Sequence, residues 1–304
     1  MHSSSVHRWN SDEGLTHLQK VLWTLLNVVN NSWYPNVRDH HLAVRDFEPD
    51  LSEEYWIQCH GGTASPSRTL ANLFLMQLPW EQIQSELRYV NVLDVGCGSG
   101  NNGSRLQSWS GGRISRYVGA DMREHSDWKD VSRRNAGVRF LCADAQDIST
   151  YFPGDTNFIM SQSAIEHLRW DIDFFTEIRA VLRRSLKPVI QVHLLPSAAG
   201  LSLYRWHGVR QYTPRTISLL SRIFNDCSYS RLYRLGGPVS NAVHMGFITK
   251  PLFAKGQADM HKPRTGPYSD RVRAAIAGDS AGLPAAPSFY ALVIHSHARE
   301  IIFR

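Results

Sequence analysis

A glycine run that follows an apolar segment is the first place where this sequence could do chemistry. Residues 92–100 read VLDVGCGSG, so the apolar segment carries an aspartate and passes into closely spaced glycines. Glycines at the carboxyl end of a strand let the backbone turn sharply and approach a ligand closely. The dinucleotide fingerprint GxGxxG would need glycine at Asn101, so the spacing here is GxGxG. Asp94, just before the glycines, suits a cationic amine better than a pyrophosphate.

The surrounding sequence predicts a parallel sheet that would position this run. Strands are expected at residues 90–95, 117–120, 138–142, 158–160 and 189–195, with later strands at 229–235 and 289–294. The first five are short, apolar and mostly unalternating, as strands buried on both faces are. Apolar residues at helical spacing between 165 and 182 predict a helix before the fifth strand. Strands that alternate with helices imply parallel pairing with right-handed crossovers.

The flanking regions differ from this alternating middle. Leucines and valines between residues 15 and 29 recur at helical spacing, and Ser65 can cap a second helix at 66–78. These helices either cover the core or form a lid over a substrate pocket. We therefore divide the chain into a helical extension or lid at 1–88 and a main domain at 89–304. A long loop or insertion near 237–288, with some helix around 270–277, interrupts the main domain.

Four motifs in order resemble those of class I S-adenosylmethionine-dependent methyltransferases of the type 11-like group. They are the glycine run after Asp94, the strand end VGAD at 118–121, the strand end LCADA at 141–145, and the fourth motif FIMSQSAIEHL at 158–168. The resemblance covers about residues 89–196. It implies a doubly wound, Rossmann-like α/β fold with a seven-stranded, mostly parallel sheet in the order 3-2-1-4-5-7-6, in which 289–294 is antiparallel.

The resemblance also implies roles for individual residues toward S-adenosylmethionine. The glycine loop would cradle the methionine part, and Asp94 would help to hold its ammonium group. Asp121 would bind the ribose hydroxyls, since a carboxylate can accept from both at once. Asp144 would meet the adenine amino group, and Ala145 would offer its backbone amide to the ring. The expected cofactor-binding residues are Asp94, Gly96, Cys97, Gly98, Gly100, Asp121, Met122, Asp144, Ala145 and Ser161.

Methyl transfer to a hydroxyl also needs a base, and histidine is best tuned for that role near neutral pH. Three histidines lie near the expected ligand-binding edge of the sheet: His167 after the fourth strand, His193 on the fifth strand, and His207 beyond it. Glu166 precedes His167 in the Glu-His-Leu motif. Hard cations prefer oxygen ligands, and the fourth and fifth strands end without carboxylates, so we expect no metal.

We predict O-methylation of a small molecule, with a sugar, glycan or glycolipid precursor as the favoured acceptor. The helix start at 65–68 and the aromatic residues on both flanks resemble methyltransferases from polysaccharide gene clusters. Two alternatives stay open: methylation of RNA or protein, and a non-catalytic subunit that keeps the fold. Amine methylation of bases is disfavoured because the fourth strand lacks an Asn-Pro-Pro-Tyr motif.

Composition limits the surroundings and the partners. The net charge of +6 is spread thinly, which does not favour nucleic acid and leaves peripheral contact with a membrane open. The 4 cysteines form no CxxC pair, so reduced thiols are expected. The first ten residues are polar, and no apolar segment is long enough to cross a bilayer, so we expect a cytoplasmic protein.

Overall fold

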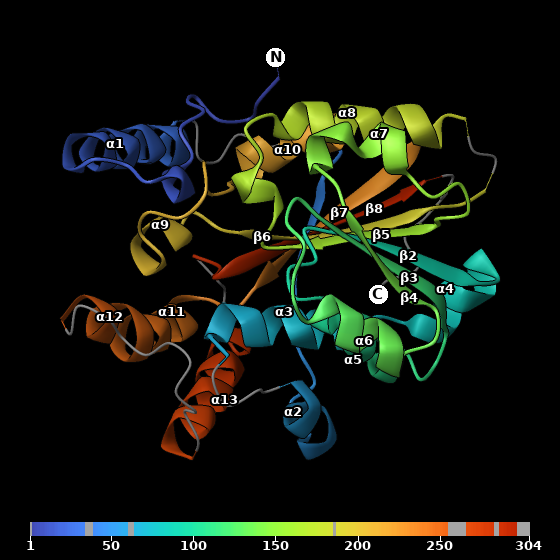
Figure 1. Ribbon diagram of the computed structural model, residues 1–304. Helices are drawn as coiled ribbons and strands as arrows, with labels where there is room; N and C mark the ends of the chain where they lie inside the picture. Colours follow the sequence, from blue (N-terminus) through green and yellow to red (C-terminus); the bar gives the residue numbers. More distant parts are fainter. Residues whose placement is uncertain are drawn as a thin grey trace.

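A central sheet lies between two layers of helices in the computed structural model (Figure 1). The structure describes residues 2–33, 39–59, 64–184, 187–254, 266–282 and 286–296. Its strands are β1 (Ala43–Asp46), β2 (Val90–Val95), β3 (Ile114–Asp121), β4 (Val138–Cys142), β5 (Phe158–Gln162), β6 (Ile190–Pro196), β7 (Ser228–Leu235) and β8 (Phe289–Ser296). Every residue of β2, β5, β6 and β8 is buried, which explains why their sequences are mostly apolar and do not alternate.

The strand order is β1-β7-β8-β6-β5-β2-β3-β4, and the pairings are parallel except where β8 meets β6 and β7. Numbered from the first predicted strand, β2 to β8 follow the order 3-2-1-4-5-7-6, so the predicted fold is confirmed. The eighth strand was missed. β1 pairs in parallel with β7 at the sheet edge, so the region expected to be helical also contributes a strand.

The helices of the two layers enclose separate hydrophobic cores. One layer holds α2 (Glu53–Cys59), α3 (Pro66–Met76), α4 (Trp80–Leu87), α5 (Asn101–Trp109), α6 (Trp128–Arg134), α11 (Pro238–His244) and α13 (Pro267–Ser280). The other holds α7 (Ile148–Tyr151), α8 (Asp171–Leu182) and α10 (Pro214–Arg222). α8 is the predicted helix before the fifth parallel strand, β6. The second predicted N-terminal helix is α3, with Pro66 in its first turn and Ser65 as its cap.

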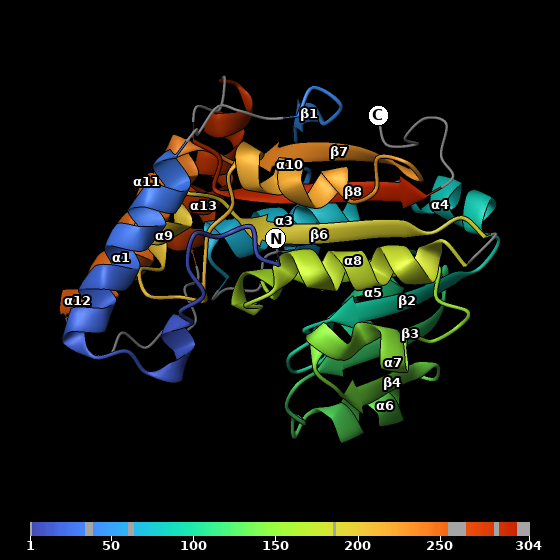
Figure 2. The ribbon, with the colours of Figure 1, turned by 90° about the horizontal axis from the view of Figure 1, so that it is seen from above.

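The first predicted helix forms, but its orientation differs from our expectation. α1 (His17–Ser32) begins with a capping box between Thr16 and Gln19. Its buried residues are Trp23, Asn27 and Asn30, whereas most of the apolar stripe is exposed: Leu18, Val21, Leu22, Leu25, Val28 and Val29. Figure 2 shows α1 at the edge of the molecule, away from the sheet. The stripe therefore does not cover the core.

The segment predicted as a loop or insertion near 237–288 is largely helical where it is described. α11 continues through a π-helical turn (Met245–Thr249) into α12 (Lys250–Ala254), and α13 includes the helix expected around 270–277. Residues 255–265 and 283–285 of this segment lie outside the described residues.

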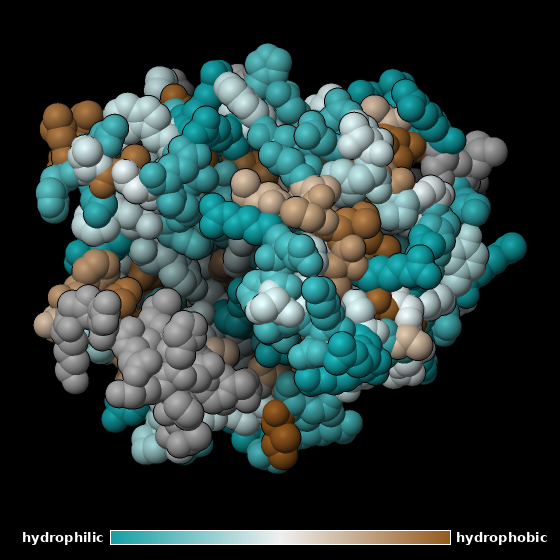
Figure 3. Space-filling model, in the orientation of Figure 1, coloured by the Kyte–Doolittle hydropathy of each residue, from teal (hydrophilic) through white to brown (hydrophobic). Residues whose placement is uncertain are grey.

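Figure 3 shows apolar atoms at the surface over α1 and α12. Within the described ranges, no helix combines the length and apolarity needed to cross a membrane.

Candidate active site

Two neighbouring cavities lie at the carboxyl ends of the parallel strands. The first, about 470 Å³, is lined by Val95–Ser99, Asn101, Asn102, Ala120–Met122, Ala143–Ala145, Ala164, Ile165, His167 and Leu168. The second, about 720 Å³, lies between α3, α9 (Gly200–Leu203), α11 and α12, and its walls include Glu166, Tyr204, Trp206, His207 and His244. Both cavities are lined by Arg68, Asn101, Arg105, Gln162 and Ser163, so they adjoin one another.

The glycine loop after β2 forms one wall of the first cavity. Gly96 has a φ of 73° and Gly98 a φ of 54°, both in the left-handed region that favours glycine. A Cβ on Gly96 would lie 2.3 Å from the Cβ of Ala164. A Cβ on Gly98 would meet nothing within 4 Å. Gly98 N–H donates to Asp121 Oδ2 at 2.9 Å, which joins the glycine loop to the end of β3.

Asp94 lies beneath this loop rather than in the cavity wall. Its carboxylate is fully buried and accepts from Tyr117 Oη at 2.6 Å and from Asn102 Nδ2 at 3.2 Å. Burial raises the pKa of Asp94 to about 6. Oδ1 has no hydrogen-bond partner among the described residues. Any effect of Asp94 on a ligand ammonium group would therefore pass through the loop or through Asn102, which does line the cavity.

Most of the other predicted cofactor residues come together at the first cavity. Cys97, Gly98, Asp121, Met122, Asp144 and Ala145 line it together with Gly96. Gly100 and Ser161 do not. Gly100 faces the ring of Phe140, which would lie 2.3 Å from an added Cβ, and buried Ser161 shares a hydrogen bond with His193 Nδ1 at 2.9 Å. The structure therefore assigns Gly100 and Ser161 to packing beneath the cavity.

His193 occupies a place that does not fit the catalytic role predicted for it. Its side chain is fully buried, lines neither cavity and packs edge-on against Phe175 at 4.8 Å between ring centroids. Burial lowers the pKa of His193 to about 3. His193 lies in the middle of β6, a central strand, and its ring packs against Phe174 and Phe175 of α8 rather than facing either cavity. The prediction of His193 as a base is therefore not supported.

His167 and His207 meet instead, together with an aspartate that sequence reasoning missed. Their rings form an edge-to-face pair with centroids 4.6 Å apart. His167 Nδ1 lies 2.5 Å from Asp12 Oδ2, and His167 Nε2 and His207 Nε2 each lie 3.9 Å from Glu166 Oε1. Asp12, His167 and His207 each offer a donor atom within 4.8 Å of the others, a spacing that a metal ion could also use.

Burial and neighbouring charges change the pKa of each residue in this cluster in a different way. Burial alone would lower the pKa of His167, but the hydrogen bond with Asp12 and the nearby carboxylates outweigh it and raise that pKa. Burial and the charge of His167 lower the pKa of His207 to about 4. Burial raises the pKa of Glu166, whose side chain is 1% exposed. His167 is thus the more basic of the two histidines.

The chain holds Asp12 in place through a short N-terminal segment, residues 2–14. Asn10 caps the turn Ser11–Glu13, and Ser11 N–H donates to Gly208 O at 2.9 Å. Gly208 N–H donates to Asp12 Oδ1 at 3.3 Å. Because Asp12 is 155 residues from His167 in sequence, no local sequence pattern could predict this contact. Ser163, another residue at the site, has a φ of 53° and likewise gave no sequence signal.

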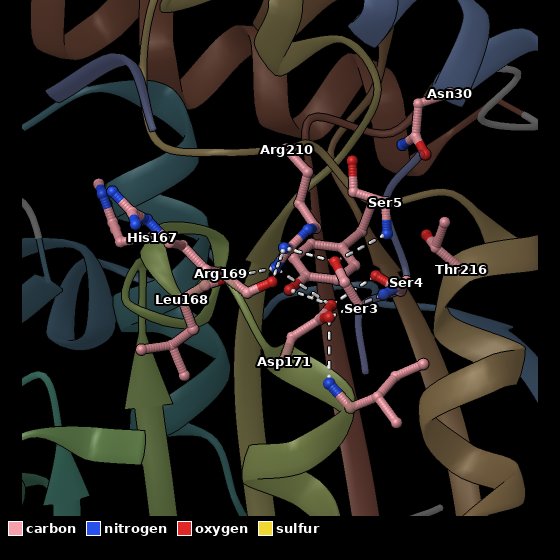
Figure 4. Close-up of polar contacts among 12 residues, drawn as sticks. Ser3, Ser4, Ser5, Asn30, His167, Leu168, Arg169, Asp171, Arg210 and Thr216 are labelled. Carbon is pink, nitrogen blue, oxygen red and sulfur yellow. Dashed lines mark hydrogen bonds and ion pairs between the residues drawn. The ribbon is translucent and has the colours of Figure 1, made fainter. Parts of the chain in front are cut away.

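A buried ion pair anchors the start of the same segment (Figure 4). Arg210 and Asp171 are both fully buried and lie 3.2 Å apart. Asp171 accepts from the backbone N–H and the hydroxyl of Ser4. Arg210 donates to the carbonyls of Leu168 and Arg169, at 2.6 and 3.0 Å, just after His167. One network therefore joins the N-terminal segment to the turn that carries His167.

The first cavity fits the nucleoside and amino-acid parts of S-adenosylmethionine. Its glycine wall is open at Gly98, so a ligand can approach the backbone closely. Carboxylates of Asp121 and Asp144 stand at the ends of two neighbouring strands, where hydroxyl and amino donors could reach them. Such crevices at the carboxyl ends of strands are the usual ligand sites of open α/β sheets.

Part of this chain matches a known protein family. Residues 92–185 match the family model described as "Methyltransferase domain". The chain is similar to a SAM dependent methyltransferase from Archaeoglobus fulgidus, at 16% identity, a TM-score of 0.44, and coverage of 81% of this chain and 100% of that one. It is also similar to a Burkholderia thailandensis 1,6-didemethyltoxoflavin-N1-methyltransferase, at 11% identity, a TM-score of 0.41, and coverage of 74% and 79%. No curated protein matches the sequence.

The family match extends across the glycine loop and the strand ends that line the first cavity. The sheet order and the cavity agree with it. Residues 92–185 therefore carry a methyltransferase domain, and the residues that line the first cavity fit S-adenosylmethionine as its cofactor.

Proposed function

We propose that the enzyme methylates a hydroxyl oxygen of a small molecule, without a metal, and that His167 is the general base. The observation that carries this proposal is the hydrogen bond between His167 and Asp12 beside the two adjoining cavities. The first cavity would hold the cofactor and the second the acceptor. S-adenosylmethionine supplies an electrophilic methyl group when it is bound, so the protein must supply position and a proton acceptor.

The orientation of His167 suits proton acceptance. Asp12 accepts the Nδ1 proton at 2.5 Å, which leaves Nε2 of the neutral ring with a lone pair. Nε2 is 3.9 Å from Glu166, too far for a hydrogen bond, so it is available to a substrate hydroxyl. Asp12 and Glu166 stabilise the imidazolium that forms. His207, with its low pKa, stays neutral and supports the ring of His167 edge-on.

The cofactor would be held by the residues that line the first cavity. We assign the ribose hydroxyls to Asp121, the adenine to Asp144, Ala145 and Met122, and the methionine part to the backbone of Gly96–Gly98 with Cys97. Asp94 would act from beneath this loop through Asn102, which its carboxylate binds at 3.2 Å. The cavities adjoin at Gln162 and Ser163, so an acceptor in the second cavity could reach a methyl group in the first.

A sugar or glycan hydroxyl remains our favoured acceptor. Tyr204 and Trp206, two of the aromatic residues that the sequence placed beyond the fifth parallel strand, line the second cavity. Aromatic faces there can stack on a sugar ring while polar side chains such as Ser65 and Asn72 contact hydroxyls. Other members of that aromatic set do not contribute: Trp56 and Trp80 are buried in the core, and Tyr34 lies outside the described residues.

A turnover assay tests the proposal. S-adenosylhomocysteine formation would be measured with sugar, glycolipid, small-molecule and nucleic-acid pools as acceptors. We expect turnover with hydroxyl acceptors, and a loss of about 100-fold or more in kcat for His167→Ala. His17→Ala, an exposed histidine at the start of α1, is the matched control. Full activity of His167→Ala would reject His167 as the base, and turnover with nucleic acid alone would favour the RNA alternative.

Three further predictions accompany this proposal. We propose the division into an N-terminal extension at 1–88 and a methyltransferase domain at 89–304, although β1 connects the extension to the main sheet. A cytoplasmic location stays a prediction. Peripheral membrane contact also stays a prediction. Vesicle binding would test it, with the exposed apolar face of α1 as the expected contact surface.

A further inference from the structure

Two arginines stand where the cavities adjoin, and the proposed chemistry does not use them. Arg68 lies in the first turn of α3 and Arg105 in the middle of α5. The two helices pack against one another, and both arginines line both cavities. Both arginines therefore border the place where the two cavities adjoin.

Neither guanidinium is matched by a carboxylate. Among the described residues, no acidic side chain forms an ion pair with Arg68 or Arg105. The charge of Arg68 acts on Asp94 and Glu166 without an ion pair to either. Asp94 accepts from Tyr117 and Asn102, and Glu166 lies against the two histidines. Partial burial is the main cause that lowers the pKa of Arg105, and the nearby charge of Arg68 lowers it further.

We propose that Arg68 and Arg105 bind an anionic group, a carboxylate or a phosphate, carried by the methyl acceptor. Guanidinium groups recognise both anions through paired N–H donors of fixed geometry. This inference rests on the proposed function, since it assigns the second cavity to the acceptor. It narrows the acceptor from any hydroxyl compound to an acidic one, such as a sugar acid or a phosphorylated sugar.

The cofactor alone does not account for the pair. S-adenosylmethionine brings one carboxylate, which can neutralise one guanidinium, and its ammonium and sulfonium groups are cationic. The other arginine, which is exposed to solvent, stays available to a second anion. The far walls of the second cavity are apolar at Leu203, Ile248 and Leu252, so the uncharged part of the acceptor would extend away from the arginines.

The test uses the full-length protein saturated with S-adenosylhomocysteine, so that the cofactor carboxylate is already in place. Inorganic phosphate and acetate are then titrated by calorimetry. We expect both to bind the wild-type complex. Arg68→Gln and Arg105→Gln should each weaken phosphate binding by about tenfold or more. The affinity for S-adenosylhomocysteine should change by less than about threefold.

Arg139→Gln is the matched control, because Arg139 is an exposed arginine on β4 outside both cavities, and it should bind phosphate as the wild type does. Arg68→Lys and Arg105→Lys keep the charge and should retain part of the affinity, which separates loss of recognition from loss of folding.

Three results would overturn the inference. The first is that neither anion binds the wild-type complex, and the second is that the glutamine variants bind phosphate normally. The third is that phosphate competes with S-adenosylhomocysteine and the variants lose affinity for that cofactor product, which would assign the arginines to the cofactor carboxylate. If the wild type does not bind S-adenosylhomocysteine at all, the proposed function fails instead.

Discussion

Asp12 controls both the orientation and the proton affinity of His167. The hydrogen bond and the negative charge of Asp12 raise the pKa of His167 above 6.5, its ordinary value. A base must be unprotonated to act, so kcat/KM should rise with pH through this raised pKa. Asp12→Asn keeps a hydrogen-bond acceptor but removes the charge. We expect the acid limb of the pH profile to move to lower pH, and the plateau to fall by about tenfold.

The neighbouring acid provides the control for this experiment. Glu13 forms an ion pair with Arg169 at 2.5 Å and does not contact His167, so Glu13→Gln should leave the limb in place. An Asp12→Asn profile that superposes on the wild-type profile would show that His167 does not carry the limb. A shift of the limb to higher pH would contradict the electrostatic argument itself.

Metal removal distinguishes a base from a ligand in the same cluster. Asp12, His167 and His207 could together hold a metal ion. However, His167 Nδ1 and Asp12 Oδ2 already share a hydrogen bond, so these two atoms are not free to bind a metal at the same time. We expect turnover to be unchanged after dialysis against EDTA, and unchanged again when zinc, manganese or magnesium is added back. Loss of turnover with EDTA and recovery with one of these metals would reassign the cluster as a metal site.

Sequence reasoning at the residue scale succeeded where a strand end fixes a side chain. Asp121 is the last residue of β3 and Asp144 lies two residues after the end of β4, and both line the cavity. Sequence reasoning failed where the role of a residue depends on which face of the sheet its side chain points to. His193 and Ser161 pair across β5 and β6 and point away from the cavity, a choice that apolar runs without alternation cannot reveal. Asp12 could not be found because only the tertiary fold brings it to His167.

The loop between β2 and α5 allows a matched test of the cofactor site. Gly98 and Gly112 have φ values of 54° and 76°, and an added Cβ on either meets no atom within 4 Å. Alanine at either position should therefore cost about 1–2 kcal/mol in folding free energy. Gly98 lines the cofactor cavity and Gly112 does not. Gly98→Ala should therefore also weaken S-adenosylmethionine binding, by about tenfold or more, because the methyl group occupies ligand space.

Calorimetric titration with S-adenosylmethionine and denaturant unfolding of both variants would make the comparison. Equal cofactor affinity in Gly98→Ala and Gly112→Ala would mean that the ligand does not approach this part of the loop. If one variant lost much more folding free energy than the other, the added methyl group would be clashing with a neighbouring atom there. Gly112→Ala would then no longer be a matched control.

Elements were predictable where burial made their sequence uniform. β2, β5, β6 and β8 are buried throughout, and each was visible as an apolar run. β1 was not, because its Ala-Val-Arg-Asp sequence is short and partly exposed at the sheet edge. The periodicity of α1 predicted a helix but not its buried face. That face is fixed by Trp23 and Asn27, which donate to the carbonyls of Trp9 and Val209.

At the scale of the whole molecule, the N-terminal segment lies outside residues 92–185, which match the methyltransferase domain, and contacts the site through Asp12 and His167. Its attachment depends on the buried pair of Asp171 and Arg210, which also holds the turn after His167. Breaking a buried ion pair by removing one charge leaves the other uncompensated. The pair therefore affects both stability and the geometry of the proposed base, and it touches the wall of the cofactor cavity only at Leu168.

Asp171→Asn should lower the free energy of unfolding by about 3–5 kcal/mol, because Arg210 stays charged and buried. It should also lower kcat, since Ser4 loses its charged acceptor and the segment that carries Asp12 is held less firmly. The affinity for S-adenosylmethionine should stay close to that of the wild type. Denaturant unfolding, turnover and cofactor titration measure the three effects separately.

The double variant Asp171→Leu with Arg210→Met removes both charges and should be less destabilised than Asp171→Asn. If both variants lose stability equally, packing rather than the charge pair holds the segment, and if Asp171→Asn keeps full kcat, the N-terminal segment does not position the base.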